Sequence, residues 1–379
     1  MSLVSDLRAV VTSGVSAMSR LSVIGCRLSP WRTALPRLLG GLAMASALMA
    51  CGSSGLYGVP GARAPSPASP SRPYDVSGLL NPAGGKFLGV DAAGAPDSLR
   101  PVRSFAASAG AAPNLIGEYM SWNDPLDTRA VTATWSYGAL YYMIWEPYHT
   151  TVAAIADGRS NGYVTRVAQE VRVLNLPVAI SFGHEMNGWW YPWGTTRTTG
   201  AQFVAAWRLI HRLFAAAGAT NVIWVWNPNV ISAEPQLDLS AWYPGNAYVD
   251  WVGITGYFGS TGPDTFDGVY GPTMEEIRTF TSKPFLIAET SVQAGADAVT
   301  AAQNLVGGVR ERPDVLGFVW FDYEKAGVDW RLETRPDVRA AIAAGLAGFP
   351  LVDVRNPRTA SGSKTAGSVR TRWPPQRKD

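Results

Sequence analysis

Eight short runs of apolar, β-branched and aromatic residues alternate with amphipathic segments, and this alternation constrains the fold more than any other feature. Segments with helical periodicity lie at 97–110, 127–138, 163–175, 201–218, 273–282, 302–313 and 337–348. Alternating strands and helices indicate a parallel sheet, and eight strands in about 250 residues predict a closed (β/α)8 TIM barrel. An open doubly wound sheet is the alternative, but no GxGxxG or P-loop follows the first run. The eight runs are 86–92, 114–122, 140–148, 177–185, 221–229, 249–258, 284–292 and 315–323.

The segments flanking this pattern differ from it in composition. Residues 1–51 contain arginines followed by the apolar run 38–50 and then Cys51, which predicts an export signal with a lipobox-like end, with Met18 as an alternative start. An ordinary signal peptide or a short membrane anchor is the alternative. Residues 52–85 are rich in Pro, Gly and Ser and predict a linker, and 351–379 predict a basic, disordered tail. The folded unit is therefore predicted at 86–350.

Charge and cysteine content exclude several classes of function. The net charge of +3 comes largely from the tail, so the barrel segment has no basic field and we expect no nucleic-acid partner. The two cysteines, Cys26 and Cys51, precede the folded unit. The predicted barrel therefore has neither a disulfide framework nor a thiol active site.

Polar side chains follow the apolar bodies of the predicted strands, at the barrel end where parallel-barrel enzymes place their chemistry. Alternation along the fourth strand predicts that Glu185 shares a face with the small residues Ala179, Ser181 and Gly183. Such a face leaves room beneath an inward carboxylate. The polar residues at the strand ends are Glu118, Glu146, His184, Glu185, Asn227, Asn229, Tyr257, Glu289 and Asp322.

Two of these carboxylates are harder to explain as salt bridges or helix caps. Glu185 and Glu289 each follow an apolar run with no adjacent cation. Glycoside hydrolysis needs a protonated acid and an ionised carboxylate on either side of one bond. Glu185, flanked by Met186 and aromatic rings, suits the proton donor, and Glu289 suits the ionised partner, with Tyr257 able to orient it.

Metal and serine chemistry fit the sequence less well. His184 and Glu185 lack the second histidine of an HExxH zinc motif, and His149 and His211 offer no ligand spacing. No G-x-S-x-G nucleophile motif follows a strand. We therefore expect neither metal catalysis nor a serine nucleophile.

At this point the sequence resembles glycoside hydrolase family 26, the β-mannanase family. The resemblance is carried by HEMNGWWYPWG at 184–194, together with WEP at 145–147, ITGYF at 254–258, IAET at 287–290 and VWFD at 319–322, in the family's order. It covers about 86–335. The chain departs from many relatives at Ser181, where they carry arginine.

The resemblance implies a role for each matching residue. It makes Glu185 the acid/base and Glu289 the nucleophile of a retaining reaction through a covalent glycosyl-enzyme. It also implies that a polysaccharide is the partner and that neither a metal nor an organic cofactor is needed. Residues implied to line the sugar site are His184, Trp190, Tyr257, Trp320 and Trp145.

These features predict an exported endo-β-1,4-mannanase, secreted or tethered to the cell surface through a lipid on Cys51, and we expect a monomer. The family also contains enzymes for mixed-linkage β-glucan and β-1,3-xylan, so these substrates stay open. A non-catalytic polysaccharide-binding lipoprotein is a further alternative. A purely structural envelope protein would leave the paired glutamates unexplained.

Overall fold

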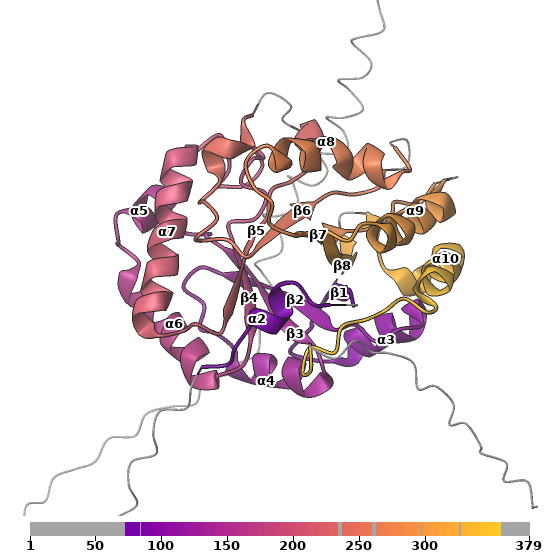
Figure 1. Ribbon diagram of the computed structural model, residues 1–379, viewed down its shortest axis with the longest axis horizontal. Helices are drawn as coiled ribbons and strands as arrows, with labels where there is room; N and C mark the ends of the chain where they lie inside the picture. Colours follow the sequence, from indigo (N-terminus) through magenta and orange to yellow (C-terminus); the bar gives the residue numbers. More distant parts are fainter. Residues whose placement is uncertain are drawn as a thin grey trace, which may run out of the picture. The chain divides into compact units, whose positions relative to one another are not determined.

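The computed structural model describes residues 73–83, 85–233, 237–259, 263–295, 297–325 and 327–357. Eight parallel strands close into a barrel in which each strand pairs with the next and β8 pairs with β1 (Figure 1). The predicted (β/α)8 barrel is confirmed. Its strands are β1 (Phe87–Ala92), β2 (Leu115–Ser121), β3 (Leu140–Glu146), β4 (Val178–Phe182), β5 (Val222–Trp226), β6 (Trp251–Thr255), β7 (Phe285–Thr290) and β8 (Val315–Asp322).

Helices surround the strands, with α5, α6 and α7 on one side and α3, α9 and α10 on the other (Figure 1). Helix α8 begins seven residues before the predicted segment and contains Pro272, a residue that usually ends a helix. The helices are α2 (Ser77–Leu80), α3 (Arg100–Ala109), α4 (Thr128–Tyr137), α5 (Val152–Ala156), α6 (Asn161–Leu174), α7 (Gly200–Ala217), α8 (Phe266–Arg278), α9 (Ala298–Glu311) and α10 (Pro336–Leu346).

Local sequence explains how the longest of these helices starts and ends. Thr199 accepts a hydrogen bond from the backbone N–H of Gln202, and the Gln202 side chain accepts one from the Thr199 backbone, which forms a capping box. The helix ends at Ala217 and is capped by Gly218, which adopts a left-handed conformation at φ 73°. Caps of this kind fix where the chain leaves the helix for strand β5.

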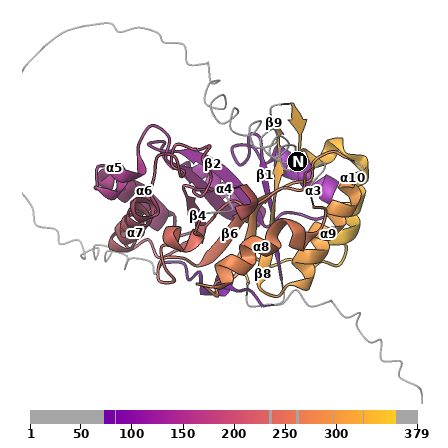
Figure 2. The ribbon, with the colours of Figure 1, turned by 90° about the horizontal axis from the view of Figure 1, so that it is seen from above.

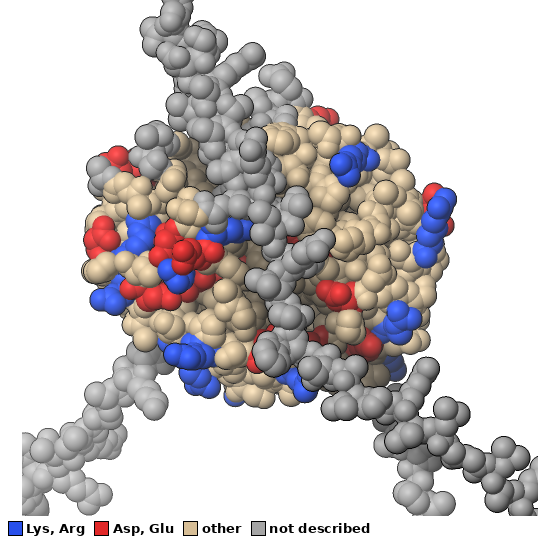
Figure 3. All heavy atoms as spheres, turned by 180° about the vertical axis from the view of Figure 1, so that it is seen from behind, with Lys and Arg blue, Asp and Glu red and all other residues tan. Residues whose placement is uncertain are grey.

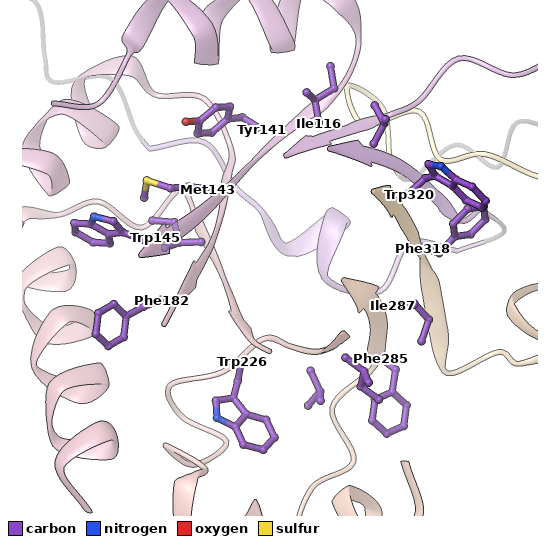
Figure 4. Packing of buried hydrophobic residues seen from close by; sticks show 14 of the residues in the cluster. Ile116, Tyr141, Met143, Trp145, Phe182, Trp226, Phe285, Ile287, Phe318 and Trp320 are labelled. Carbon is purple, nitrogen blue, oxygen red and sulfur yellow. The ribbon is translucent and has the colours of Figure 1, made fainter. Parts of the chain in front are cut away.

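Alternation along the strands separates two buried layers. One layer fills the barrel interior and includes Tyr142, Ile144 and Trp251. The other lies between the strands and the helices and includes Trp145, Phe182, Trp226 and Trp320 (Figure 4). The alternation of side chains along each strand therefore decides which layer a tryptophan joins. Most of the large rings pack between the strands and the helices.

A short helix and a C-terminal segment close the barrel at the amino-terminal ends of its strands. Leu79 of α2 has no exposed surface and belongs to the interior layer, while the Trp251 indole donates to the Leu80 carbonyl oxygen at 2.9 Å. On the other side, Asn114 donates to the Val352 carbonyl oxygen at 2.9 Å. The folded unit thus extends beyond the predicted limits of 86 and 350, because residues on both flanks bury apolar side chains beneath the barrel.

Two further strands follow β8. Strands β9 (Glu324–Lys325) and β10 (Val328–Asp329) form an antiparallel hairpin, and β9 projects from one end of the barrel in the side view of Figure 2. The described residues also form three short 3-10 helices. They are η1 (Ile231–Ala233), η2 (Leu239–Trp242) and η3 (Leu332–Thr334).

On the face shown in Figure 3, acidic and basic side chains are interleaved and much of the surface is uncharged. Among the described residues, no helix is both long enough and apolar enough to cross a membrane. The predicted export signal, most of the linker and most of the tail lie outside the described residues.

Candidate active site

Glu185 reaches the barrel mouth through a turn rather than by continuing strand β4. The strand ends at Phe182, three residues earlier than its predicted end, and both Gly183 and Glu185 have left-handed φ angles, of 57° and 52°. A non-glycine residue in this region is uncommon and is found where the surrounding structure enforces it. The Glu185 backbone N–H donates to the Asn227 carbonyl oxygen at 2.7 Å, which ties the turn to strand β5.

The Glu185 carboxyl group is buried and held by two donors. The Trp190 indole N–H donates to Oε2 at 2.7 Å, and the Asn229 amide donates to Oε1 at 2.8 Å. Burial and the neighbouring negative charge of Glu289 raise the pKa of Glu185 to about 7, although the two hydrogen bonds oppose this rise. Near neutral pH this group can therefore give up a proton and take it back.

A reciprocal pair of asparagines sets the position of one donor. The Asn187 amide donates to the Asn229 carbonyl oxygen, and the Asn229 backbone N–H donates to Asn187 Oδ1, both at 2.8 Å. This clamp joins the turn after β4 to the end of β5. It leaves the Asn229 side chain free to bind Glu185.

Glu289 enters the site because strand β7 is irregular. Leu286 and Ala288 belong to the barrel interior, so strict alternation would turn Glu289 outward, toward the helices. The register against β6 shifts by one residue, because Ile254 pairs with Ile287 whereas Thr255 pairs with Glu289. Such a bulge re-aims a side chain, and here it directs Glu289 inward.

Two phenols hold the Glu289 carboxylate. Tyr119 from β2 donates to Oε2, and Tyr257, just after β6, donates to Oε1. Burial, followed by the charge of Glu289, raises the pKa of both tyrosines well above its usual value, so both remain neutral donors. The two oxygens of Glu289 are thus bound from opposite sides of the barrel, which fixes the direction of the carboxylate.

Further ionisable groups lie within electrostatic range of this pair. Burial raises the pKa of Glu146, at the end of β3, to about 8, with smaller contributions from the charges of Glu289 and Glu185. Lys325 of the β9–β10 hairpin opposes this rise in Glu146 and also lowers the pKa of Glu185. The charge of Lys325 therefore lowers the pKa of both Glu146 and Glu185.

Beneath the pair lies a buried acid that sequence reasoning did not select. Asp91 of β1 has no exposed surface, and both its carboxyl oxygens lack a hydrogen-bond partner among the described residues. Burial, and then the charge of Glu289, raises its pKa well above the usual range. The Tyr142 and Ser181 hydroxyls are also buried in the barrel interior, so the floor beneath the two carboxyl groups is polar.

His184 is buried next to Glu185. Burial, followed by the charge of Lys325, lowers its pKa to about 3, so the imidazole is neutral. Its Nε2 lies 3.2 Å from the Tyr191 hydroxyl, and its ring lies 5.9 Å from that of Tyr119. His184 therefore packs between the loop after β4 and the tyrosine that holds Glu289.

The structure thus brings together five of the seven predicted site residues: Glu185, Glu289, His184, Trp190 and Tyr257. It places Trp145 and Trp320 elsewhere. Both indoles are fully buried in the layer facing the helices, where Trp145 donates to the Tyr163 hydroxyl and Trp320 to the Trp330 carbonyl oxygen (Figure 4). A ring with no exposed surface cannot contact a sugar, so the predicted substrate contacts of these two residues do not fit this arrangement.

Alternation of side chains along the strands could have assigned two further residues, Tyr119 and Glu146, to the site. Tyr119 follows Leu115 and Gly117 on one face of β2, and Glu146 follows Tyr142 and Ile144 on one face of β3. By contrast, Glu118 points to the other face, where it accepts a hydrogen bond from Tyr141 at 2.6 Å. Among the described residues, no group of three or more His, Cys, Asp or Glu side chains is placed to hold a metal ion.

Comparisons with known proteins agree with this geometry. The sequence profile of glycosyl hydrolase family 26 matches residues 140–277. Endoglucanase H of Acetivibrio thermocellus is 29% identical over 272 residues, which is 66% of this chain and 30% of the relative. A mannan endo-1,4-β-mannosidase of Bacillus subtilis is 25% identical over 188 residues, or 47% of this chain and 49% of the relative. The chain therefore spans about a third to a half of the length of these relatives.

Solved structures show the same fold. A family 26 β-mannanase from Bacteroides ovatus superposes with a TM-score of 0.56 at 16% identity, covering 76% of this chain and 98% of that one. A family 26 protein from a Muricauda species superposes with a TM-score of 0.52 at 19% identity, covering 73% and 94%. In its profile match, its relatives and its barrel, this chain is similar to glycosyl hydrolase family 26.

Proposed function

We propose that the protein is a retaining endo-glycosidase that hydrolyses β-1,4-mannosidic bonds in mannan-type polysaccharides. One observation carries this proposal: two neighbouring buried carboxyl groups have different partners. Glu185 has a pKa raised to about 7 and is held by an amide and an indole, whereas Glu289 is held by two neutral phenols. Acid and nucleophile roles require such a division between two carboxyl groups.

In the first step the Glu289 carboxylate attacks the anomeric carbon of the sugar. Glu185 gives its proton to the glycosidic oxygen, the bond between that oxygen and the anomeric carbon breaks, and the leaving sugar chain departs. A glycosyl ester on Glu289 remains. The hydroxyls of Tyr119 and Tyr257 keep the attacking carboxylate aligned, which lowers the entropy cost of reaching the transition state.

In the second step Glu185 changes from acid to base. Esterification removes the negative charge of Glu289, which is one of the two causes of the raised pKa of Glu185. Its pKa therefore falls in the intermediate, and the carboxylate is ready to take a proton from water. The water oxygen then bonds to the anomeric carbon, the ester breaks, and retention of configuration results.

The choice of mannan is supported by the relatives. Several that match this chain are named mannan endo-1,4-β-mannosidases, including two from Bacillus subtilis and one from Thermothelomyces thermophilus. A second candidate substrate is a β-glucan, because the Acetivibrio relative that aligns over 66% of this chain is named an endoglucanase. A β-1,3-xylanase from an Alcaligenes species also matches, over 27% of the chain.

The test is an incubation of the protein with β-1,4-mannan, mixed-linkage β-glucan and β-1,3-xylan, followed by sizing of the products. We expect short oligosaccharides from mannan, and loss of most of this activity in folded Glu185→Gln and Glu289→Ala variants. If only β-glucan or only xylan released oligosaccharides, that polysaccharide would be the substrate in place of mannan. Binding without turnover, with parent and variants alike, would instead identify a non-catalytic polysaccharide-binding protein.

We also propose that the protein is exported and attached to the cell surface by a lipid on Cys51. An apolar run of 13 residues after several arginines supports this, and a polymer substrate is met outside the cell. Mass spectrometry of the mature N-terminus tests it. We expect a lipidated Cys51 at the N-terminus, and release of the protein from membranes in a Cys51→Ala variant. An unmodified N-terminus at another position would refute the lipid anchor.

A further inference from the structure

An exposed tryptophan stands on the loop that carries the candidate acid. The Trp189 side chain is 40% exposed, and Val173, on helix α6, is the other exposed large apolar residue among those the structure describes. Indole buries a large apolar area when it binds a partner, and its flat face suits stacking against another ring. The proposed mechanism gives Trp189 no role.

The loop around Trp189 is firmly held. Tyr191 and Trp193 stack at 4.4 Å with an interplanar angle of 8°, and the Trp193 indole donates to the His184 carbonyl oxygen at 2.7 Å. The Thr195 backbone N–H donates to the Gly188 carbonyl oxygen at 2.9 Å. A Cβ added at Gly188 would lie 2.4 Å from the Trp190 ring, so any side chain at Gly188 would collide with that ring. The exposed indole is therefore presented by a backbone already fixed in place.

The acid side of the site lies next to this indole. The Trp190 ring contacts Trp189 edge to face, with centroids 6.0 Å apart, and its N–H binds Glu185 Oε2 at 2.7 Å. A general acid must lie within hydrogen-bond reach of the oxygen that it protonates. That oxygen belongs to the departing sugar, so the surface beside Glu185 borders the path of the leaving chain.

We propose that Trp189 is a sugar-stacking platform for the leaving-group side of the substrate. The inference rests on the proposed function and extends it, because it assigns a residue that determines how strongly the departing chain is bound. The flat indole face fits the apolar C–H face of a pyranose ring. Binding energy gained there, away from the bond that breaks, helps to hold that bond in the reactive geometry.

The same platform serves the second half of the reaction. In the glycosyl-enzyme, a sugar hydroxyl can replace water: its oxygen bonds to the anomeric carbon, Glu185 accepts the proton, and the ester to Glu289 breaks. The acceptor sugar occupies the place that the leaving chain vacated. Trp189 therefore favours transfer to sugar over transfer to water.

The test compares two substrates in the full-length protein. Mannohexaose has sugars on the leaving side, whereas 2,4-dinitrophenyl β-mannobioside has only an aryl group there. Trp189→Ala is expected to lower kcat/KM on mannohexaose about tenfold, as expected from the apolar area lost, and to leave the aryl substrate within about twofold of the parent. Trp189→Phe keeps a flat ring and should recover most of the loss.

Val173→Ala is the matched control, because it removes an exposed apolar side chain from helix α6 and should change neither substrate. Trp189→Ala should also lower the ratio of transfer products to hydrolysis products from mannohexaose. If Trp189→Ala lowered kcat/KM equally on both substrates, or left kcat/KM on mannohexaose unchanged, Trp189 would not be a platform for the leaving chain. A parent protein inactive on both substrates would instead refute the proposed function, and the platform with it.

Discussion

At the scale of single residues, the site is governed by opposing effects on one carboxyl group. Burial and the charge of Glu289 raise the pKa of Glu185, whereas hydrogen bonds from Asn229 and Trp190 lower it. An acid is most useful when its pKa lies near the working pH, because it must both release and recover a proton in one cycle. The two donors therefore adjust the pKa as well as the orientation of Glu185.

This balance predicts a shift in the pH profile of an Asn229→Ala variant. The parent's kcat/KM should fall on the alkaline side with a midpoint near pH 7, where Glu185 loses its proton. Removing the Asn229 amide removes a contribution that lowers this pKa, so the alkaline limb should move to higher pH. Activity at the optimum should fall about tenfold, because the acid loses a positioning contact.

Asn304→Ala is the control for this profile. Asn304 lies on helix α9, and its amide donates to the Asp264 carbonyl oxygen. Its removal should leave the alkaline limb of the pH profile unchanged. Kinetics on a soluble mannan between pH 5 and 9 make the measurement. An alkaline limb that moves to lower pH in Asn229→Ala would contradict the assigned balance.

Asp91 predicts a pH dependence of stability. Its pKa is raised in the folded protein above the ordinary value of 3.8, so the folded state keeps the proton after the unfolded chain has released it. The stability that this group contributes is present below about pH 4 and is lost as the pH rises toward the folded pKa. Asp91→Asn does not titrate, so its free energy of unfolding should rise relative to the parent as the pH increases above 4.

Urea unfolding of both proteins at several pH values from 4 to 8 measures this difference. Asp91→Ala should show the same slope with pH at a lower overall stability, because it also removes packing. A difference between parent and Asp91→Asn that is constant across this range would show that Asp91 has no raised pKa in the folded state.

At the scale of elements, the alternation of side chains along each strand decides which of them point into the site. Most of the barrel, and the position of Glu185 in the candidate site, could be predicted from sequence because apolar runs, small residues and turn residues carry the signal. The orientation of Glu289 could not, because it depends on a one-residue register shift between β6 and β7. Trp145 and Trp320 belong to recognisable motifs, yet parity turns both rings toward the helices.

Close packing between neighbouring strands predicts the effect of a small substitution. A Cβ at Gly117 of β2 would lie 1.5 Å from Asp91 Oδ1, so Gly117→Ala must displace the buried acid beneath Glu289. We expect a loss of about 1–3 kcal/mol in the free energy of unfolding, together with reduced activity. Chemical denaturation and a mannan assay provide the two readouts.

Gly307→Ala is the matched control for Gly117→Ala. It lies within helix α9, and a Cβ there would meet nothing within 4 Å. Alanine in a helix should leave stability unchanged or raise it by about 0.5–1 kcal/mol. Equal effects of the two substitutions would show that the contact between Gly117 and Asp91 does not constrain the barrel interior.

At the scale of the folded unit, both ends of the barrel domain contribute to one structure. The predicted boundary at residue 86 was drawn from the composition of the linker, because the four residues of α2 are too few to show a helical period. In the structure Leu79 of this helix is fully buried beneath the barrel. A boundary of this kind depends on contacts between distant segments, which local sequence patterns do not contain.

Leu79→Ala should therefore destabilise the barrel although Leu79 lies outside the predicted domain. We expect the free energy of unfolding to fall by about 2–4 kcal/mol, as for other buried leucines. Ser77→Ala, an exposed change in the same helix, should have little effect. Thermal and urea unfolding measure both, and a Leu79→Ala protein as stable as the parent would place α2 outside the folded unit.

The central claim is that Glu289 forms a bond to the sugar while Glu185 supplies and recovers the proton. It is tested most directly by mass spectrometry of the Glu185→Gln variant after reaction with 2,4-dinitrophenyl β-mannobioside, whose leaving group needs no acid. We predict that one mannobiosyl unit accumulates on the peptide containing Glu289, and that this label is absent when Glu289 is also replaced by Ala. Release of dinitrophenol with no labelled peptide, and with a product of inverted configuration, would contradict it.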